Sequence, residues 1–412
     1  MDMAKPIIRF KGYQDDWEQR KLGDIADVTK LAGFEFTEHV VYSDEGNVIA
    51  LRGLNIKNGQ LILDDVKYID GSNFSKLSRS KLFIDDIMFT YVGTVGEVAI
   101  IKENDRFYLA PNVSRIRVKS DDSPKFISHY MRTDNFKNKV IFPLIATSSQ
   151  PALSMENIRK FTINIPTSRE EQDCLAKYFD SLDHLITLHQ RKCDETKKLK
   201  KYMLQKMFPQ NGEKVPEIRF SGFTDDWEQR KLSEIALQTY GGGTPKTANE
   251  EFWKGNIPWI QSSDLLEERL FNVKPRKYIS QEAISKSSTK LVPQNSVAIV
   301  TRVGVGKLAF MPFSYATSQD FLSLSELKIE PEFAVYALYK MMRLVSNEVQ
   351  GTSIKGITKD ELLAKEILIP DCEEQKKIGA YLHNLDDLIT LHQRELENLQ
   401  NIKKFMLEKM FV

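Results

Sequence analysis

The stretch PIIRFKGYQDDWEQRKLGDIA, residues Pro6–Ala26, occurs a second time as PEIRFSGFTDDWEQRKLSEIA at Pro216–Ala236, with 15 of 21 positions identical. A second repeated stretch opens with EEQ and closes with KMF, at Glu170–Phe208 and Glu373–Phe411, and its copies match at 20 of 39 positions. The segments between the copies, about 25–155 and 235–355, have similar lengths and strongly diverged sequences. This pattern indicates two different binding domains held in one internally symmetric scaffold.

The composition is that of an ordinary globular protein. The chain has 412 residues, of which 41% are hydrophobic and 28% charged, enough for two or three domains. The sequence contains no apolar run long enough for a membrane span, and its start, MDMAKPIIRF, has no signal-peptide core. The cysteines Cys174, Cys193 and Cys372 lack metal-ligand spacing and are too sparse for a disulfide framework. We therefore expect a cytoplasmic protein without a membrane partner.

The net charge of +1 neither identifies nor excludes a nucleic-acid binder. A protein can place its Lys and Arg residues on one surface and its acidic residues elsewhere, and a partner subunit can supply phosphate contacts. The charge indicates only that this chain does not grip DNA tightly through electrostatics alone.

The second repeated stretch predicts a long helix in each copy. Its seam positions follow a heptad-like spacing with one irregular step, and each helix of roughly 38 residues would be about 57 Å long. We expect the copies to pair as an antiparallel coiled coil, the alternative being that each packs on its own domain. His189 and His392 occupy equivalent seam positions, and we interpret them as structural. The seam comprises Leu175, Phe179, Leu182, Ile186, His189, Cys193, Thr196, Leu199, Met203 and Met207, and then Ile378, Leu382, Leu385, Ile389, His392, Leu396, Leu399, Ile402, Met406 and Met410.

The two diverged segments predict mixed α/β domains of one fold. Turns containing glycine fall alike in YVGTVGEVAI (Tyr91–Ile100) and TRVGVGKLAF (Thr301–Phe310). Strands are expected at Val48–Leu51, Ile87–Val92, Glu97–Ile101 and Ser114–Val118, with a helix near Pro124–Lys139; in the second segment they are expected at Ile257–Gln261, Ser296–Thr301, Lys307–Phe310 and Phe321–Leu327, with a helix over about Pro331–Val349.

Several catalytic patterns fail on inspection. Gly304–Lys307 lacks the spacing and the hydroxyl of a phosphate loop, and the glycine-rich Gly241–Lys246 reads as a turn. The acidic residues around Pro370–Lys376 resemble a nuclease cluster, but their place at a helix start favours capping. No methyltransferase, zinc-protease or serine-hydrolase motif is present. These observations predict a chain that is not an enzyme.

The repeated motifs carry a specific resemblance. IRFxGFxxxWEQRKLxEIA, together with EEQ through LDxLITLHQR to LxKMF, resembles the regions that frame the specificity (S) subunit of type I restriction-modification systems. The resemblance covers essentially the whole chain. It implies two target-recognition domains, each followed by a long helix, in a DNA-binding subunit without catalytic activity.

The same resemblance implies partners and cofactors. The chain would bind double-stranded DNA and assemble with two adenine-N6 methyltransferase (M) subunits and with restriction (R) subunits. S-adenosylmethionine, ATP and Mg would belong to those partner subunits, and this chain would bind no cofactor and no metal. Its target would consist of two short half-sites separated by a fixed spacer.

These inferences define an expected architecture. The fold class is mixed α/β, with two similar globular target-recognition domains separated by two long antiparallel coiled-coil helices in a pseudo-twofold repeat. The expected segments are 1–155, the first recognition domain; 156–210, a central region with a long helix; 211–355, the second recognition domain; and 356–412, a C-terminal region with a long helix. In this scheme the helices set the spacer and dock the methyltransferase subunits, and the domains read an asymmetric bipartite target in successive major grooves.

Candidate DNA-binding residues are polar side chains expected on loops of the two domains. Bases are read by Arg, Lys, Asn, Gln, Ser and Thr, although many such side chains contact only the DNA backbone. The candidates are Arg52, Asn55, Tyr91, Arg115, Ser149 and Gln150 in the first domain, and Gln261, Ser262, Asp264, Arg302, Lys307, Gln319 and Lys355 in the second.

Two other classes of protein remain open at this stage. A coiled-coil adaptor that binds proteins would show no DNA specificity in its assembled complex. An enzyme with a site between the domains would turn over substrate as an isolated chain. The diverged segments within a repeated frame favour DNA recognition over both.

Overall fold

The chain folds as two units, of which the first combines two separated parts of the sequence and the second is one continuous stretch. The computed structural model describes residues 5–31, 38–145, 151–210, 212–350 and 356–412. The first unit is Met1–His189 together with Arg394–Val412, and the second is Gln190–Gln393. Each unit therefore needs a segment of the helix that begins in the other repeat.

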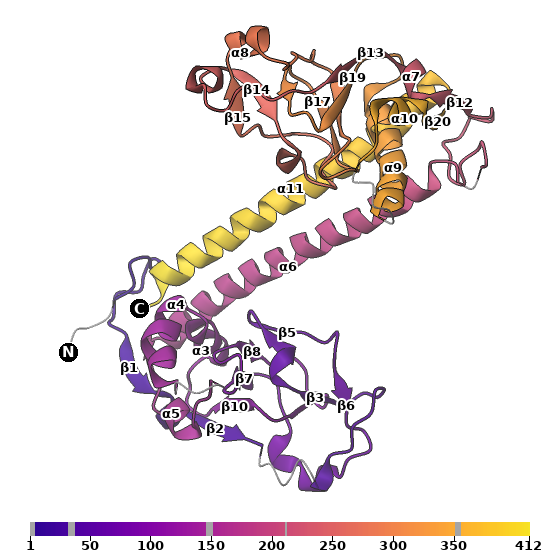
Figure 1. Cartoon of the computed structure of the whole chain (residues 1–412). Helices are drawn as coiled ribbons and strands as arrows, with labels where there is room; N and C mark the ends of the chain where they lie inside the picture. Colours follow the sequence, from indigo (N-terminus) through magenta and orange to yellow (C-terminus); the bar gives the residue numbers. More distant parts are fainter. Residues whose placement is uncertain (1–4, 32–37, 146–150, 211, 351–355) are drawn as a thin grey trace. The chain divides into compact units, whose positions relative to one another are not determined.

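Two long helices run through this division. Helix α6 spans Arg169–Lys206 and helix α11 spans Cys372–Met410 (Figure 1). Each repeated stretch thus forms one uninterrupted helix, as its sequence predicts. The boundary between the units falls inside both helices, so each helix contributes one part to each unit.

In the first unit the two helix segments pack antiparallel. Lys403 of α11 forms an ion pair with Asp183 of α6, and Phe411, eight residues further on, contacts Phe179, four residues earlier, with ring centroids 5.2 Å apart. Arg132 also contacts Asp183, at 3.0 Å. Burial alone would raise the pKa of the Asp183 carboxyl, yet the positive charges of Arg132 and Lys403 lower it below its ordinary value.

The second unit contains the equivalent ion pair. Lys200 Nζ of α6 lies 2.6 Å from Asp386 Oδ1 of α11, and the Tyr336 hydroxyl donates to Asp386 Oδ2 at 2.6 Å. Both side chains of the ion pair are largely buried. Lys200 and Asp386 occupy the positions that Lys403 and Asp183 hold in the other copy of the repeated stretch. The two units therefore hold their helix segments together by the same charge pair.

This pairing corrects one part of the predicted seam. Leu199 and Ile402 were expected to face a partner helix, but their side chains are 43% and 46% exposed. The following residue, Lys200 or Lys403, points inward instead because it must reach the aspartate of the other helix. The irregular step of the sequence pattern occurs at this turn, where the periodicity alone selected the wrong residue.

The repeated motifs also bind one another within each unit. Arg9 donates two hydrogen bonds to the Glu171 carboxylate, at 2.6 and 2.7 Å, and Arg219 does the same to Glu374 at 2.7 and 2.8 Å. Both glutamates are buried, so each charge is neutralised where it is desolvated. The IRF and EEQ motifs are therefore two halves of one contact. At the second helix start Asp371 Oδ1 accepts from the Glu373 N–H, so capping by Asp371 is confirmed, whereas Glu374 serves Arg219.

The two domains share one strand topology. Each has a four-stranded antiparallel sheet, a three-stranded mixed sheet and a two-stranded pair that joins the domain to its long helix. In the first domain these are β2 (Ala26–Lys30), β10 (Val113–Val118), β7 (Ile87–Thr90) and β8 (Val98–Ile100); β6 (Lys67–Tyr68), β3 (Ile49–Leu51) and β9 (Phe107–Leu109); and β1 (Glu18–Lys21) with β11 (Thr162–Ile165). In the second they are β13 (Ala236–Gly241), β19 (Phe321–Leu327), β16 (Ser296–Val300) and β17 (Leu308–Met311); β15 (Lys277–Ile279), β14 (Ile257–Ile260) and β18 (Ala316–Thr317); and β12 (Glu228–Lys231) with β20 (Glu366–Ile369).

Short helices and a small hairpin complete each domain. The first domain alone has the hairpin, β4 (Ile56–Lys57) and β5 (Gln60–Leu61), among the described residues. Its helices are α1 (Leu22–Ile25), α3 (Pro124–Met131), α4 (Asp134–Phe136) and α5 (Met155–Arg159), with short turns η1 (Gly53–Asn55), η2 (Phe74–Lys76), η3 (Ser78–Ser80), η4 (Lys137–Ile141) and η5 (Phe142–Leu144). The second domain has α7 (Leu232–Ile235), α8 (Gln281–Lys286), α9 (Pro331–Gln350) and α10 (Lys359–Ala364), with η6 (Glu250–Trp253) and η7 (Ser262–Asp264).

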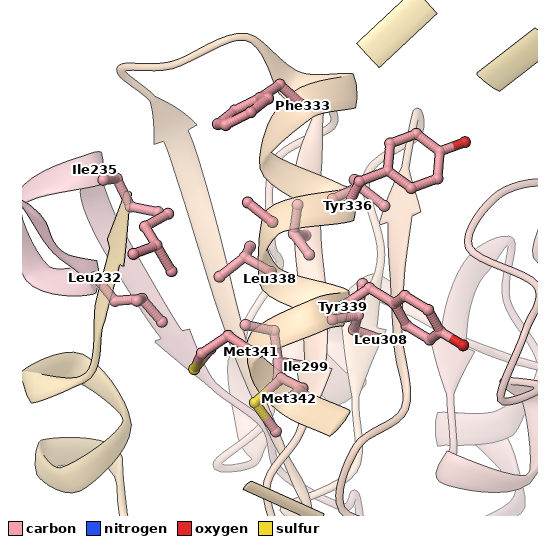
Figure 2. Packing of buried hydrophobic residues seen from close by; sticks show 14 of the residues in the cluster. Leu232, Ile235, Ile299, Leu308, Phe333, Tyr336, Leu338, Tyr339, Met341 and Met342 are labelled. Atoms are coloured by element: carbon pink, nitrogen blue, oxygen red, sulfur yellow. The ribbon is translucent and has the colours of Figure 1, made fainter. Parts of the chain in front are cut away.

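Helix α9 shows how the core of the second domain is built. Phe333, Leu338 and Met342 are buried in one cluster with Ile299 of β16 and Leu308 of β17. Figure 2 shows these side chains between α9 and the strands, with the helix covering one face of the sheet. The expected helix over Pro331–Val349 is confirmed. The equivalent helix expected at Pro124–Lys139 is broken after Met131, because Thr133 accepts the Phe136 N–H and starts a new turn.

Among the described residues, no helix combines the length and apolarity that crossing a membrane requires.

The contribution of the Lys200–Asp386 ion pair to the stability of the second unit can be measured. Replacing Lys200 with Met would leave the Asp386 carboxylate buried beside the Tyr336 hydroxyl without a counter-charge. We expect the free energy of local opening to fall by about 2–4 kcal/mol for amides in this part of α6 and α11, measured by native-state hydrogen exchange. The control is Lys201→Met at the exposed neighbouring position, which should change this value by less than about 0.5 kcal/mol. Equal hydrogen-exchange rates in the Lys200→Met and Lys201→Met variants would show that the Lys200–Asp386 ion pair does not hold the two helices together.

Candidate nucleic-acid interface

Three turns of the first domain meet around a cleft of about 690 Å³. One follows strand β3 and contains η1, the second connects β7 to β8, and the third connects β9 to β10. A Cβ placed on Gly53 would lie 3.9 Å from Thr90 Cγ2, so the first turn packs directly on the end of β7. The lining includes Arg52, Leu54, Lys57, Thr94, Glu97 and Asn112.

The first turn is held from inside by Asn55. Its side-chain oxygen accepts from the Arg52 backbone N–H at 3.1 Å, and its amide nitrogen donates to the carbonyls of Ile62 and Asp65 at 3.0 and 2.7 Å. Asn55 is fully buried. The prediction that Asn55 contacts DNA is therefore wrong: its hydrogen-bonding groups maintain the turn. Arg52 remains at the cleft, where it donates to Asp65 at 2.9 Å.

Two other first-domain candidates lie deeper than expected. Arg115 is buried, donating to Asp27 at 2.8 Å and to the Arg79 carbonyl at 3.0 Å, so its predicted DNA contact is also corrected to a supporting role within the sheet. Tyr91 is half-buried at the end of β7, with Lys30 Nζ 5.8 Å from its ring centroid. Burial raises the pKa of its hydroxyl, so Tyr91 stays neutral at physiological pH.

The second domain places equivalent turns together. Turn η7 follows β14 as η1 follows β3, and Lys307 Nζ, at the end of the β16–β17 turn, lies 3.4 Å from the Ser262 carbonyl. Arg302 is exposed and forms no ion pair with any described residue. Three of the DNA-binding candidates, Ser262, Arg302 and Lys307, therefore lie on two neighbouring turns.

The triglycine stretch brings a further loop to this cluster. A Cβ on Gly242 would lie 1.8 Å from the Ser318 carbonyl oxygen, so only glycine allows this close approach. The next residue but one, Thr244, donates to Gln319 Oε1 at 2.5 Å. Gln319 is exposed, next to the end of β18. The stretch follows strand β13 and packs closely on the backbone at Ser318, and residues 242–246 contain no assigned turn, so the predicted turn is not observed.

Asp264 repeats the role of Asn55. Its carboxylate accepts from the Gln261 backbone N–H at 2.9 Å, and its side chain is 1% exposed. The predicted DNA contact of Asp264 is therefore corrected to support of the turn. The backbone of Gln261 is held in this way, and its side chain is half-buried at the start of η7.

Three candidates, Ser149, Gln150 and Lys355, lie outside the described residues. The residues that follow them are anchored alike in both domains. The Leu153 N–H donates to the Tyr91 carbonyl at 2.9 Å, and the Ile357 N–H donates to the Thr301 carbonyl at 2.8 Å.

Sequence reasoning missed Lys57 and Asn58, which line the first cleft. They belong to the β4–β5 hairpin, which rests on the helical scaffold: Arg132 donates to the Asn58 carbonyl at 3.2 Å, and Gln60 Nε2 donates to Thr187 of α6 at 2.8 Å. The signal was available, because the Asn58–Gly59 dipeptide is typical of a tight hairpin turn, and both residues have positive φ.

The role of Asn55 can be tested against base reading. Asn55→Ala would leave the Arg52 N–H and the Ile62 carbonyl without the partner that Asn55 supplies, and the Asp65 carbonyl with Arg52 as its donor, so we expect the first domain to lose about 1–3 kcal/mol of stability. Arg302→Ala, at an exposed position, should leave stability within about 0.5 kcal/mol. Thermal unfolding of both full-length variants checks this. An Asn55→Ala protein as stable as the parent would restore Asn55 to the candidate contacts.

Comparison with known proteins identifies the fold and the family. The family model described as the type I restriction modification DNA specificity domain matches residues 14–198 and again residues 224–401. The two matches correspond to the two repeats and together cover most of the chain. The matched domain is a recognition domain rather than a catalytic one, in agreement with the sequence motifs.

Individual relatives agree with the family match. A Methanocaldococcus jannaschii protein provisionally named the MjaX specificity subunit of a type I restriction enzyme is 24% identical over 405 residues, covering 95% of this chain and 91% of the relative. The EcoR124I/EcoR124II specificity subunit of Escherichia coli is 32% identical over 172 residues, 39% of this chain and 41% of the relative.

The fold is shared with a crystal structure of the S subunit of a type I restriction-modification system from M. genitalium, with a TM-score of 0.67 and 13% identity over 99% of each chain. A chain from a structural study of complex assembly and conformational transition in a type I restriction-modification system gives a TM-score of 0.52 at 19% identity, over 96% of this chain and 97% of that chain. With both of its repeats matched by the family model, the chain belongs to the family of type I restriction-modification specificity subunits.

Proposed function

We propose that each globular domain reads one half of an asymmetric, bipartite DNA target through its cluster of turns. The observation that carries this proposal is the recurrence of one turn cluster, at the same strand ends of two domains with the same topology, with different exposed side chains. Equivalent positions with different chemistry are what two unlike half-sites require. The proposed recognition segments are residues 1–155 and 211–355.

The exposed side chains have the chemistry of base reading. Arg302 is free of ion pairs with described residues, and an arginine can donate two hydrogen bonds to the major-groove edge of guanine. Lys57 and Lys307 supply positive charge beside the turns, where phosphates would pass. The proposed contacts are Arg52, Lys57, Tyr91, Gln261, Ser262, Arg302, Lys307 and Gln319, together with Ser149, Gln150 and Lys355 outside the described residues.

The long helices have the proposed role of setting the spacer and docking two methyltransferase subunits. In each unit a buried ion pair fixes the register between α6 and α11, so that helix length is transmitted without slippage. The similar chain with a TM-score of 0.52 comes from work on complex assembly in such a system, which supports a multisubunit context. S-adenosylmethionine, ATP and Mg would then be bound by methyltransferase and restriction subunits. Action on cellular DNA places the proposed complex in the cytoplasm.

The proposed base contact of Arg302 can be tested by substitution. In a complex reconstituted with the methyltransferase subunits, Arg302→Ala should lower methylation by about 10–100-fold and relax base discrimination at one position of one half-site. The measurement is the methylation rate on targets carrying single base changes throughout both half-sites. Arg230→Ala, an exposed arginine on β12, is the matched control and should leave discrimination unchanged. A uniform loss across all target sequences would show that Arg302 contacts only phosphate.

The second prediction concerns the spacer. Four residues inserted into α6 after His189 and four into α11 after Gln393 would lengthen both helices by about 6 Å where the chain passes between the units. Contacts inside each unit stay unchanged, so the two half-sites should be retained while the spacer grows by about one to two base pairs. Mapping of N6-methyladenine in cells checks the outcome.

An insertion in α6 alone is the control for the spacer experiment, because it lengthens only one helix of the pair and should lower activity. The double-insertion variant, if active on the original spacer, would show that the helices do not set the distance. If the double-insertion variant is inactive on the original target, its methylation activity is measured on targets whose spacers range from two base pairs shorter to four base pairs longer.

A further inference from the structure

Two apolar side chains, Leu54 and Val303, project from the tips of turns in the two turn clusters. Leu54, at the tip of the first turn in domain one, is 55% exposed, and Val303, at the tip of the β16–β17 turn in domain two, is 72% exposed. Neither belongs to a hydrophobic cluster of its domain. Neither is among the DNA-binding candidates of the sequence, which are all polar side chains.

Backbone geometry holds each tip outward. The Val305 N–H donates to the Arg302 carbonyl at 3.1 Å, and Gly304 has φ +92°, so Val303 occupies the corner of a tight turn that needs glycine at the next position. In the first domain the Asn55 N–H donates to the Arg52 carbonyl at 2.9 Å, and buried Asn55 anchors the same turn. Both side chains therefore lie on turns that are closed by backbone hydrogen bonds.

The tips lie among the proposed DNA contacts. Leu54 lines the cleft beside Arg52 and Lys57. Val303 follows exposed Arg302, and the neighbouring Gly304 would place a Cβ 4.0 Å from Ser262 Cβ. Val303 stands next to Arg302, whereas Leu54 shares the lining of its cleft with Arg52 and Lys57 and also with Tyr42, Val92 and Pro111. The basic residues beside both tips favour a partner that carries phosphates.

The major groove of DNA offers one apolar feature, the C5 methyl group of thymine. We propose that Leu54 and Val303 each contact a thymine methyl group, one in each half of the target. This inference rests on the proposed DNA-reading function and deepens it.

The test replaces each target thymine singly by deoxyuridine, which lacks only the methyl group. Competition binding uses the full-length chain assembled with its methyltransferase subunits. The parent complex should lose about fourfold in affinity at one position in each half-site, the effect of one buried methyl-sized group. Leu54→Ala should abolish the sensitivity in one half only, and Val303→Ala should abolish it in the other half only.

Controls separate this inference from general effects. Ile84→Ala in domain one and Leu237→Ala in domain two remove apolar side chains that are 48% and 64% exposed near the other ends of their sheets, and they should keep the parent pattern. Leu54→Met and Val303→Ile retain an apolar tip and should keep uracil sensitivity, which guards against misfolding of the alanine variants.

Distinct outcomes overturn distinct statements. A parent complex that binds its target but tolerates uracil at every position refutes the thymine contacts while leaving the proposed function intact. The same conclusion follows if the alanine variants keep the parent sensitivity, or if both lose it in the same half. A complex without any preference for its target over scrambled DNA would refute the proposed function itself.

Discussion

The structure depends on the burial of the C-terminal ends of the two long helices. The end of α11 is buried in the core of the first unit, and the end of α6 in the core of the second. Phe411, at the end of α11, packs on Trp17 and Phe126 in the first unit, with centroid distances of 6.3 and 5.4 Å. Phe208, at the end of α6, packs on Trp227 and Phe333 in the second, at 5.8 and 5.6 Å. Each core thus contains an aromatic side chain from the end of the long helix that begins in the other unit. Because buried aromatic area dominates such packing, each repeat needs the other to fold.

The ion pairs between α6 and α11 fix the register in which the two helices pack. A buried charge pair contributes little net stability, but a slipped register would strand an aspartate without its lysine. The Arg9–Glu171 and Arg219–Glu374 pairs act similarly where each helix begins. Together these contacts account for some of the positions that are identical in the two repeats, namely the Arg, Glu, Lys and Asp residues of the ion pairs.

The turn clusters combine a fixed interior with a variable exterior. Asn55 and Asp264 occupy equivalent positions and accept equivalent backbone N–H groups, although they differ in charge. The residues around them differ: Arg52 is charged where Gln261 is neutral, and Leu54 is apolar where Ser263 is polar. Such an arrangement lets exposed side chains change while the turn geometry persists, which is the requirement of a module that reads many targets.

Much of the architecture was predictable from the sequence, because the repeats and their heptad-like spacing report local periodicity and the domains share a pattern of strands. The two long helices, the paired domains and the strands β7, β10, β16 and β19 follow from it. Tertiary structure alone decided the details that depend on partners distant in sequence. It turned Lys200 inward in place of Leu199, because Asp386 lies on another helix. It buried Asn55, Arg115 and Asp264, because a polar side chain on a loop serves the backbone as readily as a ligand. It also exposed Leu54 and Val303, since exposure is set by turns whose closure no periodicity reveals.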